Sequence, residues 1–284
     1  MAATVAVAIG ESGSNHCSRD DSHPPIRIGT LLGQHVFLEI VMSKVFVAGA
    51  TGQTGHLLIQ QLLKRGHHVV TVIRSISRLR ELLGEFDEAA FTVTEGSLLD
   101  LTDQQLIAQV EGCHAIASCL GHNLTLKGMY GQPRRLVTNA AERLCKAARK
   151  SSAPKPVRFV LMSSSGVRNH RLNETHSIAE RCAFALLRTL VPPHVDNEQA
   201  AEFLQTQSDE GDPDIEWSII RPDSLHDADE VTKYDLEPSP IRSPLFNSGK
   251  SSRINVAHLM AELISDDETW NRWKGKTPVL YNRD

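Results

Sequence analysis

The stretch Gly49-Ala50-Thr51-Gly52-Gln53-Thr54-Gly55 decides the fold of this chain. It follows the apolar run 44–48 and opens a segment of helical periodicity over 54–64. Glycines spaced G-x-x-G-x-x-G let a turn tighten, let the backbone approach a pyrophosphate and let the helix pack closely on the strand. Turns collect glycine, so the pattern alone is weak, but here strand, loop and helix come in the required order. The stretch therefore predicts a phosphate-binding turn at a helix N-terminus.

Beyond this turn, short β-branched runs alternate with helical periodicity, which is typical of βαβ units. The expected strands are Lys44–Ala48, His68–Ile73, Ala90–Thr94, His114–Ser118, Val157–Met162, Glu216–Ile220 and Pro278–Tyr281. The expected helices are Thr54–Lys64, Arg78–Leu83, Asp103–Val110, Arg135–Arg149, Asp196–Gln207 and Val256–Ser265. We therefore predict an α/β protein with a Rossmann-like, doubly wound and mostly parallel sheet that carries helices on both faces.

Two segments, 166–193 and 223–253, interrupt this alternation. We expect both to be long loops beyond the carboxyl ends of strands, where open α/β sheets place their ligands. They are therefore predicted to form the walls of a substrate pocket.

The N-terminal residues 1–43 differ in composition from the rest, because Ser, Gly, Asp and His dominate positions 10–24. The apolar patch Thr4–Ile9 is too short for a signal-peptide core and has no basic residue ahead of it. We predict a poorly ordered extension over 1–43, with Met42 as a candidate start, and one NAD(P)-binding domain over 44–284.

The composition favours a small-molecule partner. The chain has 284 residues, of which 40% are hydrophobic, and a formal net charge of −4. It therefore lacks the overall field that holds a nucleic acid or an anionic membrane, and no apolar run has the ~18–20 residues of a membrane span. The five cysteines are scattered without a Cys-x-x-Cys pair, which favours neither disulfides nor a metal site. We predict no nucleic-acid, membrane or metal partner, and a reducing, cytoplasmic location.

The end of the second expected strand indicates which dinucleotide is bound. The sequence there is Val70-Thr71-Val72-Ile73-Arg74, Arg78 follows one turn later, and the first carboxylate is Glu81. An Asp or Glu at this place would accept hydrogen bonds from the ribose of NAD, whereas an Arg accommodates the 2′-phosphate of NADP. NADP(H) is therefore the predicted cofactor. The alternative is that Arg74 is only a solvated surface charge.

With these residues in view, the chain resembles the atypical short-chain dehydrogenase/reductase group, especially the flavin reductase/biliverdin-IXβ reductase and NmrA-like proteins. The resemblance covers nearly all of 44–284. It rests on Val47–Gly55, Val72–Arg74, Ser77–Leu79, Gly96–Leu99, Leu120-Gly121 with Asn123, Ser163-Ser164, Val191–Pro193, Ile220–Pro222 and Arg253–Val256.

The resemblance implies a role for each matching position. The turn residues would bind the pyrophosphate, Arg74 and Arg78 the 2′-phosphate, and Leu98 the adenine. The residues after the fourth and fifth strands and Pro222 would surround the nicotinamide half. The implied cofactor-binding residues are Gly49, Thr51, Gly52, Gln53, Thr54, Gly55, Arg74, Arg78, Ser97, Leu98, Cys119, Leu120, Gly121, Ser163 and Pro222.

Two departures from the family pattern stand beside these matches. Gly96-Ser97 occurs where the family usually has Gly-Asp, and Asp223-Ser224 where the flavin-reductase branch has Pro-His. The first departure means that one hydrogen bond to the adenine amine need not form in this chain. The second means that the substrate stacking of the flavin-reductase branch need not occur here.

The sequence lacks the Tyr-x-x-x-Lys pair with which classical members activate a carbonyl. Four residues after Tyr130 stands Arg134, four after Tyr234 stands Pro238, and Tyr281 is too near the end. This favours hydride transfer to a flavin, quinone or similar conjugated acceptor, where proximity supplies the catalysis. Ser164 is the candidate catalytic residue, as a hydrogen-bond partner of the acceptor or of the carboxamide. The alternative is a strand-end serine that only satisfies local backbone.

Other titratable residues are weaker candidates. His122 follows the fourth strand and is a possible proton donor near the nicotinamide. His194 stands beside Asp196, which is expected to be an N-cap, and Glu198 and Glu202 are expected to lie on a solvated helix face. Two other functions stay open: an NmrA-like NADP(H) sensor without turnover, and an epimerase- or chaperone-like protein with a structural cofactor.

Overall fold

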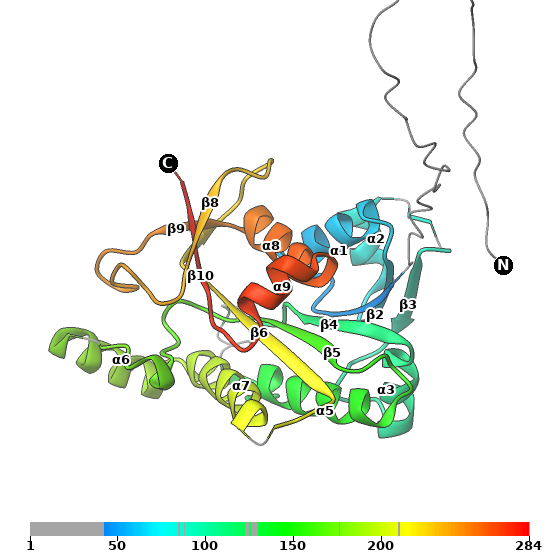
Figure 1. The fold of residues 1–284 in the computed structure, drawn as a ribbon, viewed down its shortest axis with the longest axis horizontal. Coiled ribbons are helices and arrows are strands. Elements are labelled where there is room, and N and C mark those ends of the chain that lie inside the picture. Colours follow the sequence, from blue (N-terminus) through cyan, green and yellow to red (C-terminus); the bar gives the residue numbers. More distant parts are fainter. Residues whose placement is uncertain are drawn as a thin grey trace, which may run out of the picture. The chain divides into compact units, whose positions relative to one another are not determined.

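A mostly parallel β-sheet lies at the centre of the domain (Figure 1). The computed structural model describes residues 43–284 except 85, 88, 123–124, 126–129, 176, 210 and 284. The sheet has eight strands in the order β3-β2-β1-β4-β5-β6-β10-β8, and only β8 is antiparallel to its neighbour. The strands are β1 (Lys44–Ala48), β2 (His68–Ile73), β3 (Phe91–Glu95), β4 (Cys113–Ser118), β5 (Val157–Met162), β6 (Ile215–Pro222), β8 (Tyr234–Glu237) and β10 (Val279–Asn282).

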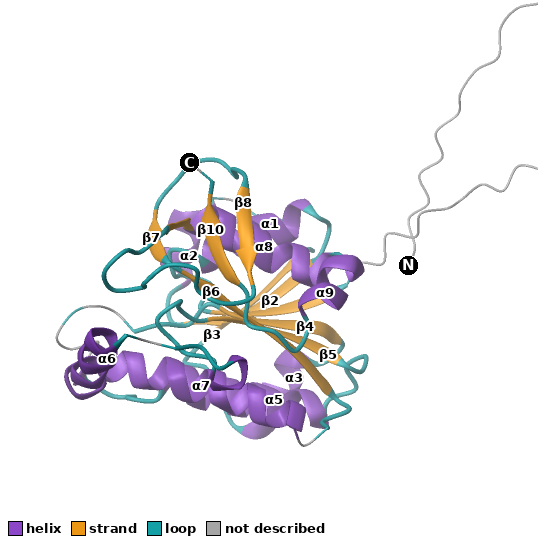
Figure 2. Ribbon diagram, turned by 60° about the vertical axis from the view of Figure 1, so that its left-hand side comes forward, coloured by secondary structure: helices purple, strands orange, loops and turns teal. Residues whose placement is uncertain are grey.

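Helices cover both faces of this sheet (Figure 2). One face carries α1 (Gly55–Lys64), α2 (Ile76–Leu83), α8 (Arg253–Ser265) and α9 (Asp267–Trp273). The other carries α3 (Asp103–Val110), α5 (Leu136–Lys150) and α7 (Pro192–Asp209). Because side chains alternate along a strand, Phe46 of β1 joins the core under α5 while Val45 and Val47 join the core under α1. The predicted Rossmann-like fold class is confirmed.

Most boundaries agree with the sequence analysis to within a few residues. The ranges expected for β1, β2, β5 and α3 match the structure at both ends. Gly66 follows the end of α1: it has a φ of +79°, and its N–H donates to the carbonyl of Leu63 at 3.0 Å.

The expectation of a loop over 166–193 is wrong. This segment contains a short 3₁₀ turn (His170–Leu172) and the helix α6 (Ile178–Leu190). A capping box starts α6: the Ser177 hydroxyl accepts from the N–H of Glu180, whose carboxylate accepts from the N–H of Ser177. The Ser-x-x-Glu pattern is a local sequence signal for this helix N-terminus.

The segment 223–253 also holds regular structure that the sequence analysis did not expect. It contains β7 (Ser224–His226), β8 and β9 (Lys250–Ser252), and β7 pairs with β9 in a separate parallel ribbon. These strands are only three or four residues long, so they carry little periodicity from which to predict them.

The described residues all belong to one compact unit. The expectations for the extension 1–43 and for a start at Met42 fall on residues 1–42, which lie outside the described residues. None of the described helices combines the length and hydrophobicity that spanning a bilayer requires.

Candidate functional site

The turn after β1 is built so that only glycine fits at two positions. Gly49 has a φ of +84°, and a Cβ there would lie 2.8 Å from the carbonyl carbon of Cys119. A Cβ on Gly55 would overlap the carbonyl oxygen of Gly49. The N–H of Gly52 donates to that same oxygen at 2.9 Å, and a Cβ on Gly52 would come within 3.1 Å of it. The turn therefore brings bare backbone to the N-terminus of α1, where Thr54 is the N-cap.

The end of β2 presents two arginines in different circumstances. Arg78 lies in the first turn of α2, and its guanidinium pairs with Glu81 at 2.9 Å. Arg74 is exposed, and among the described residues it has no hydrogen-bond or ion-pair partner. Arg74 is therefore the more available of the two predicted phosphate ligands.

The segment around Leu98, which is expected to contact the adenine, is fixed by hydrogen bonds from an arginine that was not predicted from the sequence. Arg143 of α5 donates to the carbonyls of Leu98 at 3.1 Å and Leu99 at 2.6 Å, and also to the carbonyl of Leu101. Leu98 itself is 9% exposed and packs in the core. These partners are more than 40 residues apart in the chain, so no local pattern indicates them.

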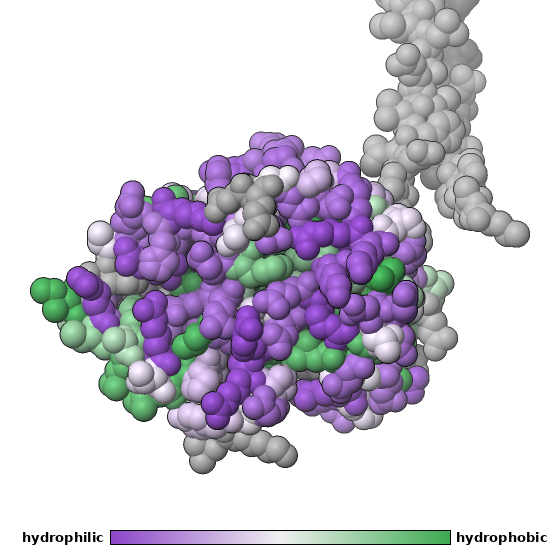
Figure 3. Space-filling model, turned by 90° about the horizontal axis from the view of Figure 1, so that it is seen from below, coloured by the Kyte–Doolittle hydropathy of each residue, from purple (hydrophilic) through white to green (hydrophobic). Residues whose placement is uncertain are grey.

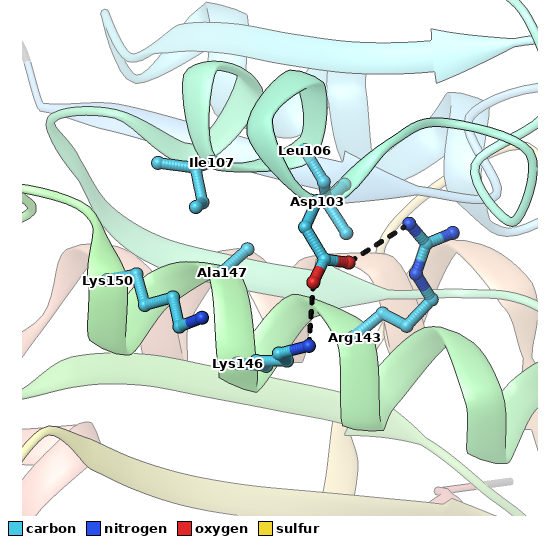
Figure 4. Close-up of a pocket in the computed structure, with 7 residues that line it drawn as sticks. All are labelled: Asp103, Leu106, Ile107, Arg143, Lys146, Ala147 and Lys150. Atoms are coloured by element: carbon cyan, nitrogen blue, oxygen red, sulfur yellow. Dashed lines mark hydrogen bonds and ion pairs between the residues drawn. The ribbon is translucent and has the colours of Figure 1, made fainter.

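Figure 4 shows the other side of Arg143, where it faces Asp103 of α3 together with Lys146. The Lys146 ammonium lies 2.6 Å from that carboxylate and the Arg143 guanidinium 3.7 Å. The hollow beside them has no enclosed space for even a water molecule. We therefore assign no ligand to it.

The end of β4 contacts the glycine turn directly. The N–H of Cys119 donates to the carbonyl of Ala48 at 2.9 Å, and its sulfur lies 3.5 Å from the sulfur of Met260. Burial raises the pKa of Cys119 to about 12, so its thiol stays protonated and is not a nucleophile. Leu120 is partly buried and Gly121 is exposed, so this wall leads from the core to the surface.

The ends of β5 and β6 lie side by side and carry the predicted nicotinamide contacts. Ser163 donates its N–H to the carbonyl of Ile220, and Ser165 does so to Pro222, at 2.8 and 2.9 Å. The hydroxyl of Ser163 is buried and has no hydrogen-bond partner among the described residues. Ser164 is half-buried, and its hydroxyl accepts from the N–H of Gly166 at 3.2 Å. The local backbone role expected as the alternative for Ser164 is thus present.

A buried ion pair ties the segments around these strand ends together. Arg221 of β6 is 1% exposed and binds both carboxylate oxygens of Glu174 at 2.8 and 2.9 Å. Its remaining N–H groups reach the carbonyls of Val167, Pro238 and Thr277. Burial works against the charge of Glu174, but the hydrogen bonds and charge of Arg221 lower the pKa of this carboxyl. Arg221 therefore links both predicted pocket walls to β6.

His122 and Asp196 form a second buried pair. The Nε2 of His122 lies 2.7 Å from Asp196, and their side chains are 5% and 1% exposed. Asp196 also accepts from the N–H groups of Val137 and Thr138 at 2.8 and 3.0 Å. The expectation that Asp196 caps its own helix is therefore wrong: it lies inside α7 and satisfies the first turn of α5, almost 60 residues away in the chain.

The expectation of a solvated face for Glu198 is also wrong, whereas Glu202 is exposed as expected. Glu198 accepts from Arg188 of α6 at 2.9 Å and lies 3.3 Å from His194. Burial disfavours its charge, but the nearby His194 and the hydrogen bonds from Arg188 lower the pKa of Glu198 to about 2. These contacts join α6 to α7.

Comparison with known families decides the class. Residues 49–267 match a family model described as NAD(P)H-binding. The chain belongs to the NAD(P)H-binding family. The match begins at the first glycine of the turn and extends past the ends of β5 and β6, so the walls described above lie within the part shared with the NAD(P)H-binding family.

Solved structures agree on the fold. A short-chain dehydrogenase/reductase from Veillonella parvula, in complex with NADP, has a TM-score of 0.61 at 17% identity, over 84% of this chain and 94% of that one. ChuY, an anaerobillin reductase from Escherichia coli O157:H7, has a TM-score of 0.59 at 19% identity, over 85% and 98%. An uncharacterised chloroplastic protein of Arabidopsis thaliana is 25% identical over 226 residues, 80% of this chain and 73% of that protein.

The residues of the site suit the dinucleotide of the NAD(P)H-binding family. The glycine turn leaves backbone uncovered at a helix N-terminus, which attracts phosphate. The hydroxyl of Ser163, without a partner among the described residues, lies at the end of β5, where the nicotinamide is predicted to bind; a carboxamide there would offer both a donor and an acceptor. Among the described residues no cluster of His, Cys, Asp and Glu is arranged to hold a metal ion.

Proposed function

We propose that this protein is an NADPH-dependent reductase that delivers hydride to a conjugated acceptor, such as a flavin or quinone, without a tyrosine acid. The observation that carries the proposal is that each of the three tyrosine hydroxyls already has a hydrogen-bond partner within the chain. The Tyr130 hydroxyl donates to the carbonyl of Leu190, that of Tyr234 pairs with His258, and that of Tyr281 accepts from the N–H of Ile241.

The pKa values of the buried tyrosines support this reading. Burial raises the pKa of Tyr234 to about 12, and burial together with Asp223 raises the pKa of Tyr281. An efficient acid or base has a pKa near the working pH, which requires a shift in the opposite direction. Neither tyrosine is therefore prepared for carbonyl chemistry.

The residues of the chain then bind the cofactor, orient its ring against the acceptor and shield both from water. Bound NADPH would supply the hydride. The glycine turn and Arg74 would hold its phosphates, and the residues after β4, β5 and β6 would flank the ring. We assign to Ser164 a hydrogen bond to an acceptor heteroatom or to the carboxamide, because its hydroxyl still has a proton to donate while it accepts from Gly166. Water can supply the second proton of a conjugated acceptor.

NADPH consumption against a panel of flavins, quinones and tetrapyrroles tests the proposal. Turnover with at least one acceptor is expected. Tight NADPH binding with every acceptor unreacted would contradict it and would favour the NmrA-like sensor. We propose a small-molecule substrate and a reducing location such as the cytoplasm, since the four described cysteines are free thiols.

Replacing Arg74 by Ala is expected to remove the preference for NADPH. The parent protein should bind NADPH at least tenfold more tightly than NADH, about 1.4 kcal/mol, because the guanidinium pairs with the 2′-phosphate. Titration calorimetry with both cofactors measures this. Arg80→Ala removes another exposed charge of the same region and should keep the preference. Equal affinities in the parent protein would refute the role of Arg74.

Replacing any one tyrosine by Phe is expected to leave kcat within a few-fold of the parent. Removal of a true general acid usually costs ~10²–10⁴-fold. The measurement is kcat with the best acceptor of the panel, with NADPH affinity as the control for folding. A collapse of kcat in Tyr130→Phe, Tyr234→Phe or Tyr281→Phe with NADPH binding intact would restore a tyrosine-acid mechanism.

A further inference from the structure

Helix α6 turns an apolar stripe toward the solvent. Ile178, Leu186 and Leu190 are 80%, 59% and 53% exposed, and Cys182 is exposed as well. These four residues recur every four positions, so they lie on one side of the helix. Only Glu180 and Phe184 of α6 are buried. The helix therefore packs on the domain through a narrow face, and its apolar stripe stays exposed to solvent.

A neighbouring loop, 238–250, extends this apolar surface. The hydroxyl of Ser243 donates to Glu180 of α6 at 2.6 Å, which fixes the loop beside the start of the helix. Ile241 and Phe246 on this loop are 64% and 63% exposed. Figure 3 shows hydrophobic residues gathered at the end of the molecule where α6 lies. Contiguous exposed apolar patches commonly mark interaction sites, whereas single scattered apolar residues do not.

The same surface is positively charged. Segments 166–190 and 238–250 contain six Arg and Lys residues and two carboxylates. The charge of Glu174 is balanced by its pair with Arg221, and Glu180 is buried. Arg181 and Arg188 lie seven residues apart along one margin of the stripe, and Arg188 is paired with Glu198 of α7. Arg181, Arg242 on the loop and Lys250 at the start of β9 are exposed.

We propose that α6 and the loop 238–250 dock on an anionic lipid surface. An apolar stripe bordered by arginines is the pattern of a helix that lies in a membrane interface, with its apolar side chains among the lipids and its cations at the headgroups. A second copy of this chain is a poorer occupant, because a twofold interface would set this cationic surface against itself. The net charge of −4 disfavours lipid binding only as an average over the whole surface.

Vesicle flotation with the full chain tests the proposal. Binding is expected to phosphatidylcholine vesicles that contain phosphatidylserine, not to phosphatidylcholine alone, and is expected to weaken in high salt. Ile178→Ser with Leu186→Ser, and separately Arg181→Glu with Arg242→Glu, should each lower the bound fraction at least tenfold. The matched control is Lys64→Glu with Arg80→Glu, which reverses two exposed charges on α1 and α2 and should bind as the parent does. NADPH affinity and circular dichroism should be unchanged in all three.

Three results would overturn the proposal. The parent chain could fail to float with any vesicle. The α1 and α2 control could lose binding as strongly as the α6 variants, which would show general electrostatic attraction instead of a docking face. Finally, light scattering could show a dimer that Ile178→Ser with Leu186→Ser dissociates, which would make the stripe an interface between copies.

Discussion

Replacing Gly52 by Val is expected to abolish NADPH binding while the domain still folds. The Cβ of a residue at position 52 would stand 3.1 Å from the carbonyl oxygen of Gly49, so the turn must shift by a few tenths of an ångström. The two branches of valine would then occupy the space through which a pyrophosphate approaches the turn's N–H groups. Titration calorimetry should detect no binding, and far-ultraviolet circular dichroism should match the parent.

Ala108→Val is the matched control, because Ala108 is an exposed residue of α3 far along the chain from the turn. It adds two methyl groups to a Cβ that is already present, whereas Gly52→Val adds the Cβ as well, and it should bind NADPH like the parent. If Gly52→Val kept the parent's affinity, the turn after β1 would not be the phosphate site. Gly55→Val is a poorer test, since its Cβ would overlap the oxygen of Gly49 and disturb folding itself.

Replacing Arg221 by Leu is expected to destabilise the domain by about 3–5 kcal/mol, the usual cost of removing one partner of a buried ion pair. Glu174 would stay buried without its partner, and the carbonyls of Val167, Pro238 and Thr277 would each lose a donor. Urea unfolding at neutral pH measures the change.

The pH dependence distinguishes this cause from simple loss of packing. In the parent the pKa of Glu174 is lowered in the folded state, so its contribution to stability is present above the unfolded pKa and is lost as the pH falls through the folded pKa. The free energy of unfolding of the parent should therefore fall on acidification, because the stabilisation by the ion pair is lost. The variant has no such stabilisation to lose, so the difference in free energy between parent and variant should become smaller at low pH. A difference independent of pH would contradict the role of the pair.

Arg283→Leu is the control for that experiment. Arg283 pairs with Asp235, but their side chains are 55% and 44% exposed. Pairs in such contact with water contribute little to stability. The unfolding midpoint should stay close to that of the parent, and an equal loss in both variants would show that burial of the Arg221 pair is not what matters.

The elements that could be predicted from sequence are those that carry their own local signal. The glycine turn, β1 and α3 follow from residues within a few positions of each other, and the structure has β1 and α3 at the predicted bounds. Helix α6 had such a signal in Ser177 and Glu180 but was expected to be a loop. Its apolar stripe faces solvent, which is the opposite of the pattern that marks a helix docked on a sheet.

The contacts that were missed join residues distant in sequence. Asp196 was expected to cap the nearest helix, whereas it satisfies α5 from inside α7. Arg143 and Arg221 each hold carbonyl groups from other segments, and nothing in the spacing of their neighbours indicates a partner more than 40 residues away. Residue type alone suggests only that a buried arginine must be satisfied.

Hydride transfer itself can be followed with NADPH deuterated at the transferring position. The protein is loaded with this cofactor under single-turnover conditions and mixed with the acceptor that reacts best. We expect oxidation of the cofactor to slow relative to unlabelled NADPH, and the label to appear in the reduced acceptor or in the solvent with which it exchanges. Cofactor that stays reduced with every acceptor, despite tight binding, would contradict a reductase and leave a dinucleotide sensor.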